Sequence, residues 1–159
     1  MMSLAVFDRC PPERLAAINP PPEELDVELG ESIVREGHLD HEWFVITDGE
    51  AAVSTMGRIL GVLGPGEHFG EIAILSGHPR QFTVRALTPM RVLMLTEEAF
   101  LSLLEDCAPF GRTLLVSMAR RMSSMRERES QQPPVADPFA EDLVGDLPGP
   151  HPSAATHLG

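Results

Sequence analysis

The chain has 159 residues, of which 43% are hydrophobic, and its formal net charge is −12. A chain of this length encloses one hydrophobic core, so a single globular domain is expected. Its acidic excess disfavours nonspecific attraction to DNA phosphates. No apolar run approaches the ~20 residues of a membrane span. The N-terminus also lacks the charged head and apolar core of a signal peptide, so we expect a cytoplasmic protein with no membrane partner.

Short segments separated by turn residues follow one another along the first hundred residues. Residues 10–18 open with prolines and continue with helix formers, which predicts a short N-terminal helix. From Leu25 the hydrophobic period changes to two, which is typical of half-buried strands. Strands are predicted at 25–29, 32–36, 43–47, 50–54, 58–63, 81–87 and 90–96. This succession favours a closed or sandwiched antiparallel β architecture.

Two helices are predicted after the last strand. The first covers residues 97–105, where Thr96 is a suitable N-cap and two glutamates occupy the first turn. The second covers residues 109–129 and carries one apolar stripe at three- and four-residue spacing, formed by Leu115, Met118, Met122 and Met125. The stripe could pack on its own domain or on a second copy of the chain, and its spacing favours neither.

Residues with metal or redox chemistry are few. Cys10 and Cys107 are too few for a disulfide framework or an iron–sulfur cluster. Cys107 lies among apolar residues, so we expect a small buried hydrophobic side chain. Residues 38–42 contain two histidines and two acids, which we interpret as a solvated loop rather than a metal site. The chain lacks a nucleophile–base pattern, a P-loop and a Rossmann fingerprint, so no enzymatic activity is expected.

Residues 64–86 combine the groups that a phosphorylated sugar requires. Gly70 permits a backbone conformation closed to other residues and lets a ligand approach the main chain. If the next residues open a helical turn, their amides form a small anion-binding nest. Arg80 offers a planar fork of donors for phosphate oxygens. Glu71, which only accepts hydrogen bonds when ionised, suits a sugar hydroxyl.

The sequence F-G-E-I-A at 69–73, an arginine nine positions after Glu71, and T-V-R-A at 83–86 resemble a known motif. It is the phosphate-binding cassette of the cyclic nucleotide-binding domain family, which includes the catabolite activator protein and the regulatory subunits of cAMP-dependent protein kinase. The glycines that frame G-E-S-I-V-R-E-G at 30–37, and Gly49, match as well. The resemblance covers roughly residues 4–128.

The resemblance implies a mainly β fold. This is an antiparallel jelly-roll β-barrel (a double-stranded β-helix) with a short N-terminal helix and two C-terminal helices. The implied domain spans residues 1–129, with the jelly roll at 24–96 and the helices at 97–129. Residues 130–159 contain six prolines and four acids, which predicts a Pro-rich acidic disordered tail.

The resemblance also implies a ligand, cAMP or cGMP, and no metal. Glu71 would accept the ribose 2′-hydroxyl and Arg80 would pair with the cyclic phosphate. Backbone amides would complete the phosphate cradle, near Gly70, Ile72, Ala73 and Gln81.

Two positions depart from the family pattern. After its arginine the family prefers two small residues, whereas Gln81 and Phe82 stand here. Because neighbours on a strand face opposite sides, we expect Phe82 in the core and Gln81 near the base; Phe82 in the pocket would exclude the ligand. Met125 and Arg126 occupy the positions of base-contacting hydroxyls. Arg126 could stack on a purine or belong to a solvated face.

The implied function is a ligand-sensing regulatory module, with cAMP as the expected ligand. It would signal to an unknown protein partner through movement of its C-terminal helices, driven by different affinities of two states. A homodimer through residues 109–129 is one reading of the apolar stripe. Two alternatives stay open: a ligand-free interaction scaffold, for which the bulk of Phe82 argues, and the sensory part of a transcription regulator. No helix-turn-helix follows the long helix, so DNA binding is not expected.

Overall fold

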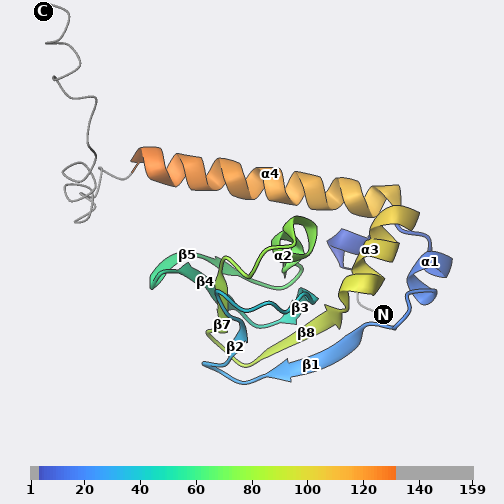
Figure 1. The fold of residues 1–159 in the computed structure, drawn as a ribbon, viewed down its shortest axis with the longest axis horizontal. Coiled ribbons are helices and arrows are strands. Elements are labelled where there is room, and N and C mark those ends of the chain that lie inside the picture. Colours follow the sequence, from blue (N-terminus) through green and yellow to red (C-terminus); the bar gives the residue numbers. More distant parts are fainter. Residues whose placement is uncertain (1–3, 132–159) are drawn as a thin grey trace, which may run out of the picture. The chain divides into compact units, whose positions relative to one another are not determined.

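The computed structural model describes residues 4–131, and the tail predicted from residue 130 lies almost entirely outside this range. The side chains of Met125 and of residues 128–131 also lie outside the description. The chain divides into two units, residues 1–120 and residues 121–159. All strands belong to the first unit (Figure 1), and the following paragraphs concern that unit unless another is named.

In the described residues, eight strands form two antiparallel sheets of four strands each (Figure 1). The first sheet has the order β1 (Glu23–Val27), β8 (Met90–Leu95), β3 (Trp43–Asp48) and β6 (His68–Phe69). The second has the order β2 (Ser32–Val34), β7 (Thr83–Ala86), β4 (Ala51–Thr55) and β5 (Arg58–Leu63). The chain crosses repeatedly from one sheet to the other, as in a jelly roll. The predicted fold class is confirmed. Its strands form two facing sheets rather than one continuously hydrogen-bonded closed barrel.

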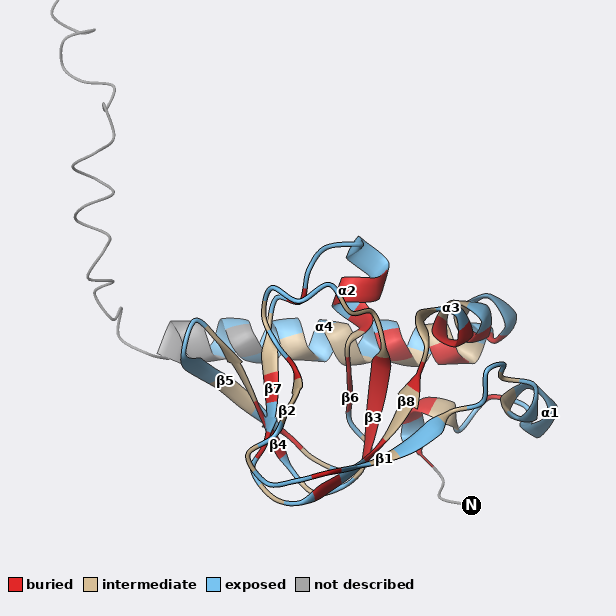
Figure 2. Cartoon of the chain, turned by 60° about the horizontal axis from the view of Figure 1, so that its bottom comes forward, coloured by how far each residue is buried: buried red, intermediate tan, exposed pale blue. Residues whose placement is uncertain are grey.

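The core consists of two clusters that share strand β3, which is buried along most of its length (Figure 2). Phe44 and Ile46 belong to the cluster between the two sheets, which we call the sheet cluster. Trp43 and Val45 point to the opposite side and join the second cluster, formed with the helices and the N-terminal segment, which we call the helix cluster. The predicted continuous apolar strand at 43–47 is thus explained, because β3 is covered on both faces.

The helices are η1 (Ala5–Phe7), α1 (Pro12–Ala16), α2 (Glu71–Ser76), α3 (Glu97–Asp106) and α4 (Ala108–Gln131). The N-terminal helix α1 is shorter than predicted, with five residues, and starts at a proline. None of the described helices is both long and apolar enough to cross a membrane. Helix α3 contributes Phe100 and Leu103 to the helix cluster, and α4 contributes Phe110 and Leu114.

Thr96 caps helix α3 as predicted. Its Oγ1 accepts a hydrogen bond from the backbone N–H of Ala99 at 3.1 Å, which satisfies one free donor of the first turn. Thr96→Ala is therefore expected to lower the free energy of unfolding by about 1 kcal/mol in urea denaturation. Thr96→Ser, which keeps the hydroxyl, should retain most of that stability. Equal losses for the two variants would show that the cap contributes nothing.

The apolar stripe predicted on the long helix does not coincide with the face of that helix that is buried. Phe110 and Leu114, which are outside that stripe, are fully buried on the helix cluster. Leu115 is 69% exposed, so this residue of the stripe does not pack on its own domain. The reason is that the buried face of α4 is set one residue earlier than the methionine spacing indicates. The homodimer through this helix stays a prediction.

The two cysteines form a disulfide, Cys10–Cys107. Cys107 is buried among apolar side chains as expected, but the disulfide it forms was not predicted. The pairing joins residues 97 positions apart in the sequence, a distance over which no local pattern indicates a partner.

Candidate functional site

Arg80 lies between α2 and β7 and is held by the loop that precedes β3. Its backbone N–H donates to the carbonyl of His38 at 2.9 Å, and its carbonyl accepts from the N–H of Gly37 at 2.8 Å. The side chain is only 3% exposed. The backbone of Arg80 is therefore fixed against residues 37 and 38 on both its N–H and its carbonyl side.

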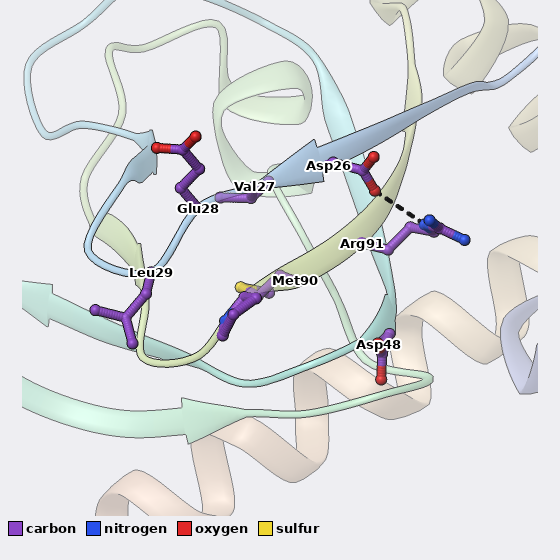
Figure 3. Close-up of a pocket in the computed structure, with 8 residues that line it drawn as sticks. Asp26, Val27, Glu28, Leu29, Asp48, Met90 and Arg91 are labelled. Atoms are coloured by element: carbon purple, nitrogen blue, oxygen red, sulfur yellow. Dashed lines mark hydrogen bonds and ion pairs between the residues drawn. The ribbon is translucent and has the colours of Figure 1, made fainter.

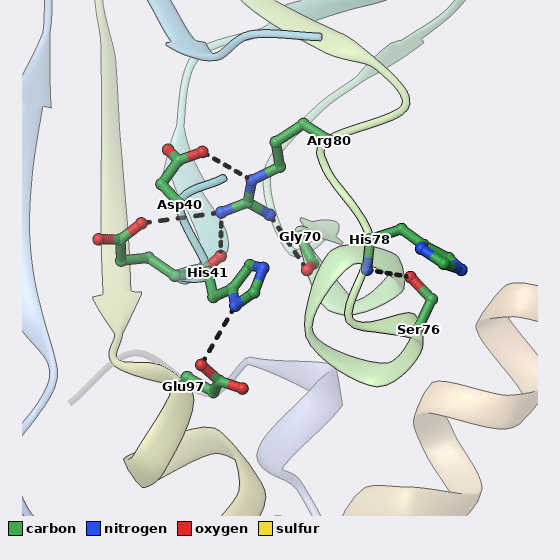
Figure 4. A network of polar contacts seen from close by, with 8 residues as sticks. Asp40, His41, Gly70, Ser76, His78, Arg80 and Glu97 are labelled. Atoms are coloured by element: carbon green, nitrogen blue, oxygen red, sulfur yellow. Dashed lines mark hydrogen bonds and ion pairs between the residues drawn. The ribbon is translucent and has the colours of Figure 1, made fainter. Parts of the chain in front are cut away.

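The Arg80 guanidinium donates three hydrogen bonds and forms a further ion pair (Figure 4). Nε donates to Asp40 Oδ1 at 3.2 Å, Nη1 donates to the carbonyl of Gly70 at 3.1 Å, and Nη2 donates to the carbonyl of Glu42 at 2.7 Å. The Glu42 carboxylate lies 3.8 Å from Nη2. The side chains of Asp40 and Glu42 are 37% and 38% exposed, so the carboxylates border solvent while the guanidinium does not.

Gly70 precedes helix α2 in a backbone conformation that favours glycine, with φ at +107°. A Cβ at this position would lie 2.6 Å from the carbonyl oxygen of Glu42 and 3.3 Å from Cα of Trp43. The loop carrying Glu42 thus packs directly on the start of the helix. The predicted need for glycine at this position follows from both its conformation and its lack of space.

The residues that follow Gly70 form the first turn of α2. Glu71 is 1% exposed, and its Oε1 lies 3.1 Å from Nδ1 of His68. Ala73 is buried, whereas Ile72 is 36% exposed. The helical turn predicted for this segment is present, and it places Glu71 inside the domain with His68 as a neighbour.

Gln81 and Phe82 lie between Arg80 and the first residue of β7. Gln81 is exposed, and its carbonyl accepts a hydrogen bond from Thr55 Oγ1 at 3.2 Å. Phe82 is half-buried and belongs to neither core cluster, so its predicted core placement is wrong. The alternation argument fails because β7 begins only at Thr83, and residue 82 precedes the ladder.

Met125 and Arg126 lie in the part of α4 that belongs to the second unit. Arg126 is exposed, and the side chain of Met125 lies outside the described part. Their contact with a base stays a prediction.

Of the predicted site residues, Gly70 and Arg80 are in direct contact, and Glu71, Ile72 and Ala73 lie in the adjoining helical turn.

The loop before β3 was not predicted to take part in the site. Its acids are not fully solvated but contact Arg80, and His41 Nδ1 lies 3.3 Å from Oε2 of Glu97, at the start of α3 (Figure 4). The sequence offers one weak signal for these contacts: Asp40 and Glu42 stand shortly before a strand that begins with four apolar residues. His68, which contacts Glu71, was also given no role on sequence grounds.

Away from Arg80, a hollow with a volume of about 520 Å³ lies where β1 and β3 end and β8 begins (Figure 3). It is lined by Asp26, Val27, Glu28, Leu29, Asp48, Pro89, Met90 and Arg91. The Arg91 Nε donates to Asp26 Oδ1 at 3.0 Å, and this hydrogen bond and the charges of Asp26 and Glu24 raise the pKa of Arg91. Three carboxylates and one paired arginine disfavour an anionic ligand there.

A comparison of the chain with models of known sequence families decides the assignment. The model of the "Cyclic nucleotide-binding domain" matches residues 24–107, which include the Gly70–Phe82 segment. The chain belongs to the cyclic nucleotide-binding domain family. The match ends before Met125 and Arg126, so it does not bear on those two positions.

Relatives of this cyclic nucleotide-binding domain include regulatory proteins. The chain is 31% identical over 117 residues to the cAMP-dependent protein kinase regulatory subunit of Mycosarcoma maydis, covering 68% of the chain and 22% of that relative. It is 36% identical over 80 residues to the same subunit of Yarrowia lipolytica, covering 49% and 21%. The cyclic nucleotide-binding domain thus spans about a fifth of the length of these relatives. Both are named as regulatory subunits rather than catalytic ones.

Solved structures share the fold of this cyclic nucleotide-binding domain. The catabolite activator protein of Thermus thermophilus superposes with a TM-score of 0.66 at 24% identity, covering 79% of this chain and 61% of that one. The cAMP-bound PfPKA-R superposes with a TM-score of 0.69 at 23% identity, covering 79% and 44%. At these identities the likeness establishes the jelly roll and its flanking helices.

Proposed function

We propose that the chain is a regulatory sensor of a cyclic nucleotide, with cAMP as the ligand. The observation that carries the proposal is the buried Arg80 guanidinium held against the carbonyl of Gly70, within the segment that matches the family. The relatives' names as cAMP-dependent kinase regulatory subunits support cAMP. The protein would act by binding and not by catalysis.

In the proposed complex the cyclic phosphate replaces the partly exposed carboxylates of Asp40 and Glu42 at the Arg80 guanidinium, because anions this close together repel one another. The shortest contact of the guanidinium, 2.7 Å to the carbonyl of Glu42, keeps it in place, whereas the Asp40 contact is 3.2 Å long and partly exposed. Phosphate oxygens would take the place of Asp40 on Arg80, and the amides of Ile72 and Ala73 would complete the cradle. Glu71 is 1% exposed and lies against His68, so it would accept the ribose hydroxyl only after a shift of α2 exposes its carboxylate.

The signal would leave the site through α2 and α3. Ile74 of α2 lies in the helix cluster together with Phe100 and Leu103 of α3, so a shift of α2 changes the packing of the helices directly. The pair His41–Glu97 supplies a second link, from the Arg80 loop to the start of α3. A change in helix position would then be read by a protein partner. The proposed sensor domain comprises residues 1–129.

One observation favours a second candidate, a ligand-free interaction scaffold. Protein acceptors already surround the Arg80 guanidinium, and Phe82 is half-buried outside both core clusters. A phosphate must therefore compete with Asp40, and a ligand must accommodate an aromatic ring beside Gln81. If these effects prevail, the fold is kept without its ligand.

A calorimetric titration of the full chain with cAMP and with cGMP separates the two candidates. We expect saturable heat with cAMP and weaker or no heat with cGMP. A rise in melting temperature with cAMP should accompany it, because a ligand that binds only the native state stabilises that state. Absence of heat and of a melting shift at millimolar cAMP would refute the sensor and leave the scaffold. Tighter binding of cGMP than of cAMP would keep the sensor proposal and change its ligand to cGMP.

A further inference from the structure

Cys107 occupies the joint between the two C-terminal helices. It is the single residue between α3, which ends at Asp106, and α4, which begins at Ala108, and its backbone is extended rather than helical. Its disulfide partner, Cys10, lies in the N-terminal segment between η1 and α1. The bond therefore ties the joint of the helix pair to a segment at the other end of the chain.

In the described residues, apolar packing and an exposed ion pair also hold this N-terminal segment to the helices. Phe7 stacks on Phe110 with ring centroids 5.9 Å apart, and Leu4 and Val6 lie in the helix cluster. The ion pair Arg14–Asp106 spans 3.7 Å between side chains that are 54% and 51% exposed, where such pairs contribute little. The disulfide is the one covalent link among these contacts. Its loss would therefore affect the restraint on the joint more than the packing of side chains around the joint.

The domain has reasons to stay folded without the bond. The helix cluster is built on large buried side chains, among them Trp43, Phe100 and Phe110. Cys10 and Cys107 are 7% and 2% exposed, and a reduced cysteine in such surroundings behaves as a small hydrophobic residue. Both redox states are thus compatible with one fold. In a thiol-reducing compartment, a disulfide is a transient or redox-sensing bond rather than a permanent one.

We propose that Cys10–Cys107 is a redox modification site that sets the mobility of the α3–α4 joint and thereby the affinity for cyclic nucleotide. The second part rests on the proposed function. The reductant is a dithiol: one thiolate attacks a sulfur of the pair, breaks the S–S bond and forms a mixed disulfide, releasing one cysteine thiolate. The second thiol of the reductant then displaces the other cysteine. Two electrons and two protons pass to the cysteines, and the reductant leaves as a disulfide.

The first test concerns the bond and the joint and requires no ligand. The full chain is alkylated in denaturant before and after treatment with dithiothreitol, and its intact mass is measured. We expect no alkylated cysteine before reduction and two after it. Amide hydrogen exchange of the folded protein should then become faster at residues 4–11 and 104–112 after reduction, and stay unchanged in β4 and β5. Two free thiols without reductant, or unchanged exchange at the joint, would overturn the proposal.

The second test measures cAMP affinity by calorimetry in the oxidised and reduced protein. We expect the dissociation constants to differ about fivefold or more. Cys10→Ser serves as the matched control: it should bind like the reduced wild type and be insensitive to dithiothreitol. Equal affinities in the two states would overturn the coupling. If neither state binds cAMP, the proposed function fails, whereas alkylation and hydrogen exchange still decide whether the redox site exists.

Discussion

Arg80→Ala is expected to weaken cAMP binding by well over tenfold and to abolish the rise in melting temperature that cAMP produces. A hydrogen bond to a charged group contributes about 1.5–3 kcal/mol, and about 1.4 kcal/mol corresponds to a factor of ten in affinity. Isothermal calorimetry gives the affinity, and thermal unfolding with and without cAMP gives the shift. Arg80→Lys, which keeps the charge but loses the planar fork, should bind more weakly than wild type and more tightly than Arg80→Ala.

The same substitution is expected to destabilise the ligand-free protein. The carbonyls of Gly70 and Glu42 lose their donor, and an unsatisfied buried acceptor costs about 1–3 kcal/mol. Asp40 is partly exposed and regains water, so it adds little. We expect a loss of about 2–4 kcal/mol in urea denaturation.

Arg85→Ala is the matched control for Arg80. The Arg85 guanidinium also donates to a carbonyl, that of Gly30 at 2.8 Å, but on the exposed side of the second sheet. Its loss should leave cAMP affinity unchanged and stability within about 1 kcal/mol of wild type. Equal effects of the two substitutions on cAMP binding would contradict a specific role for Arg80.

Gly70→Ala is expected to displace the loop that carries Glu42 and to lower the free energy of unfolding. The new Cβ would meet the carbonyl of Glu42 at 2.6 Å, so the loop that holds Arg80 must move. The positive φ adds strain of about 1–2 kcal/mol for any L-residue. Together with the overlap, which costs about 1–3 kcal/mol, we expect a loss near 3 kcal/mol or more in the free energy of unfolding.

Gly77→Ala separates the two causes at Gly70. Gly77 ends the same helix with a φ of +74°, but a Cβ there would meet no atom within 4 Å. It should therefore show only the conformational strain, about 1 kcal/mol. If both alanine variants unfold at the same urea concentration, the close approach of the Glu42 loop to Gly70 does not restrict the site.

Local features of the site could be predicted from the sequence. The positive φ of the glycine before α2, the turn of helix that follows it and the Thr96 cap depend on interactions within four residues, for which residue type and order suffice, whereas the close approach of Glu42 to Gly70 does not. The jelly roll and the pairing of its sheets came from the family resemblance. Periodicity alone indicated short antiparallel strands and could not choose among their arrangements.

Contacts between distant segments could not be predicted in this way. Arg80 binds Asp40 and the Glu42 carbonyl, which are 40 and 38 residues earlier in the chain. The direction of the Phe82 side chain depends on where β7 begins, because side chains alternate between the two faces only within a strand. The Cys10–Cys107 bond spans the whole jelly roll. In each case the partner is fixed by tertiary packing rather than by local order.

The position of Trp43 gives this protein a built-in optical probe. The chain has one tryptophan and no tyrosine, so its intrinsic fluorescence comes essentially from a single indole. That ring lies 5.2 Å from Phe100 and 5.4 Å from Phe110, between centroids, on the side of β3 that faces the helices. Its emission wavelength and its accessibility to a quencher such as acrylamide therefore follow the packing of α3 and α4 directly, without any label.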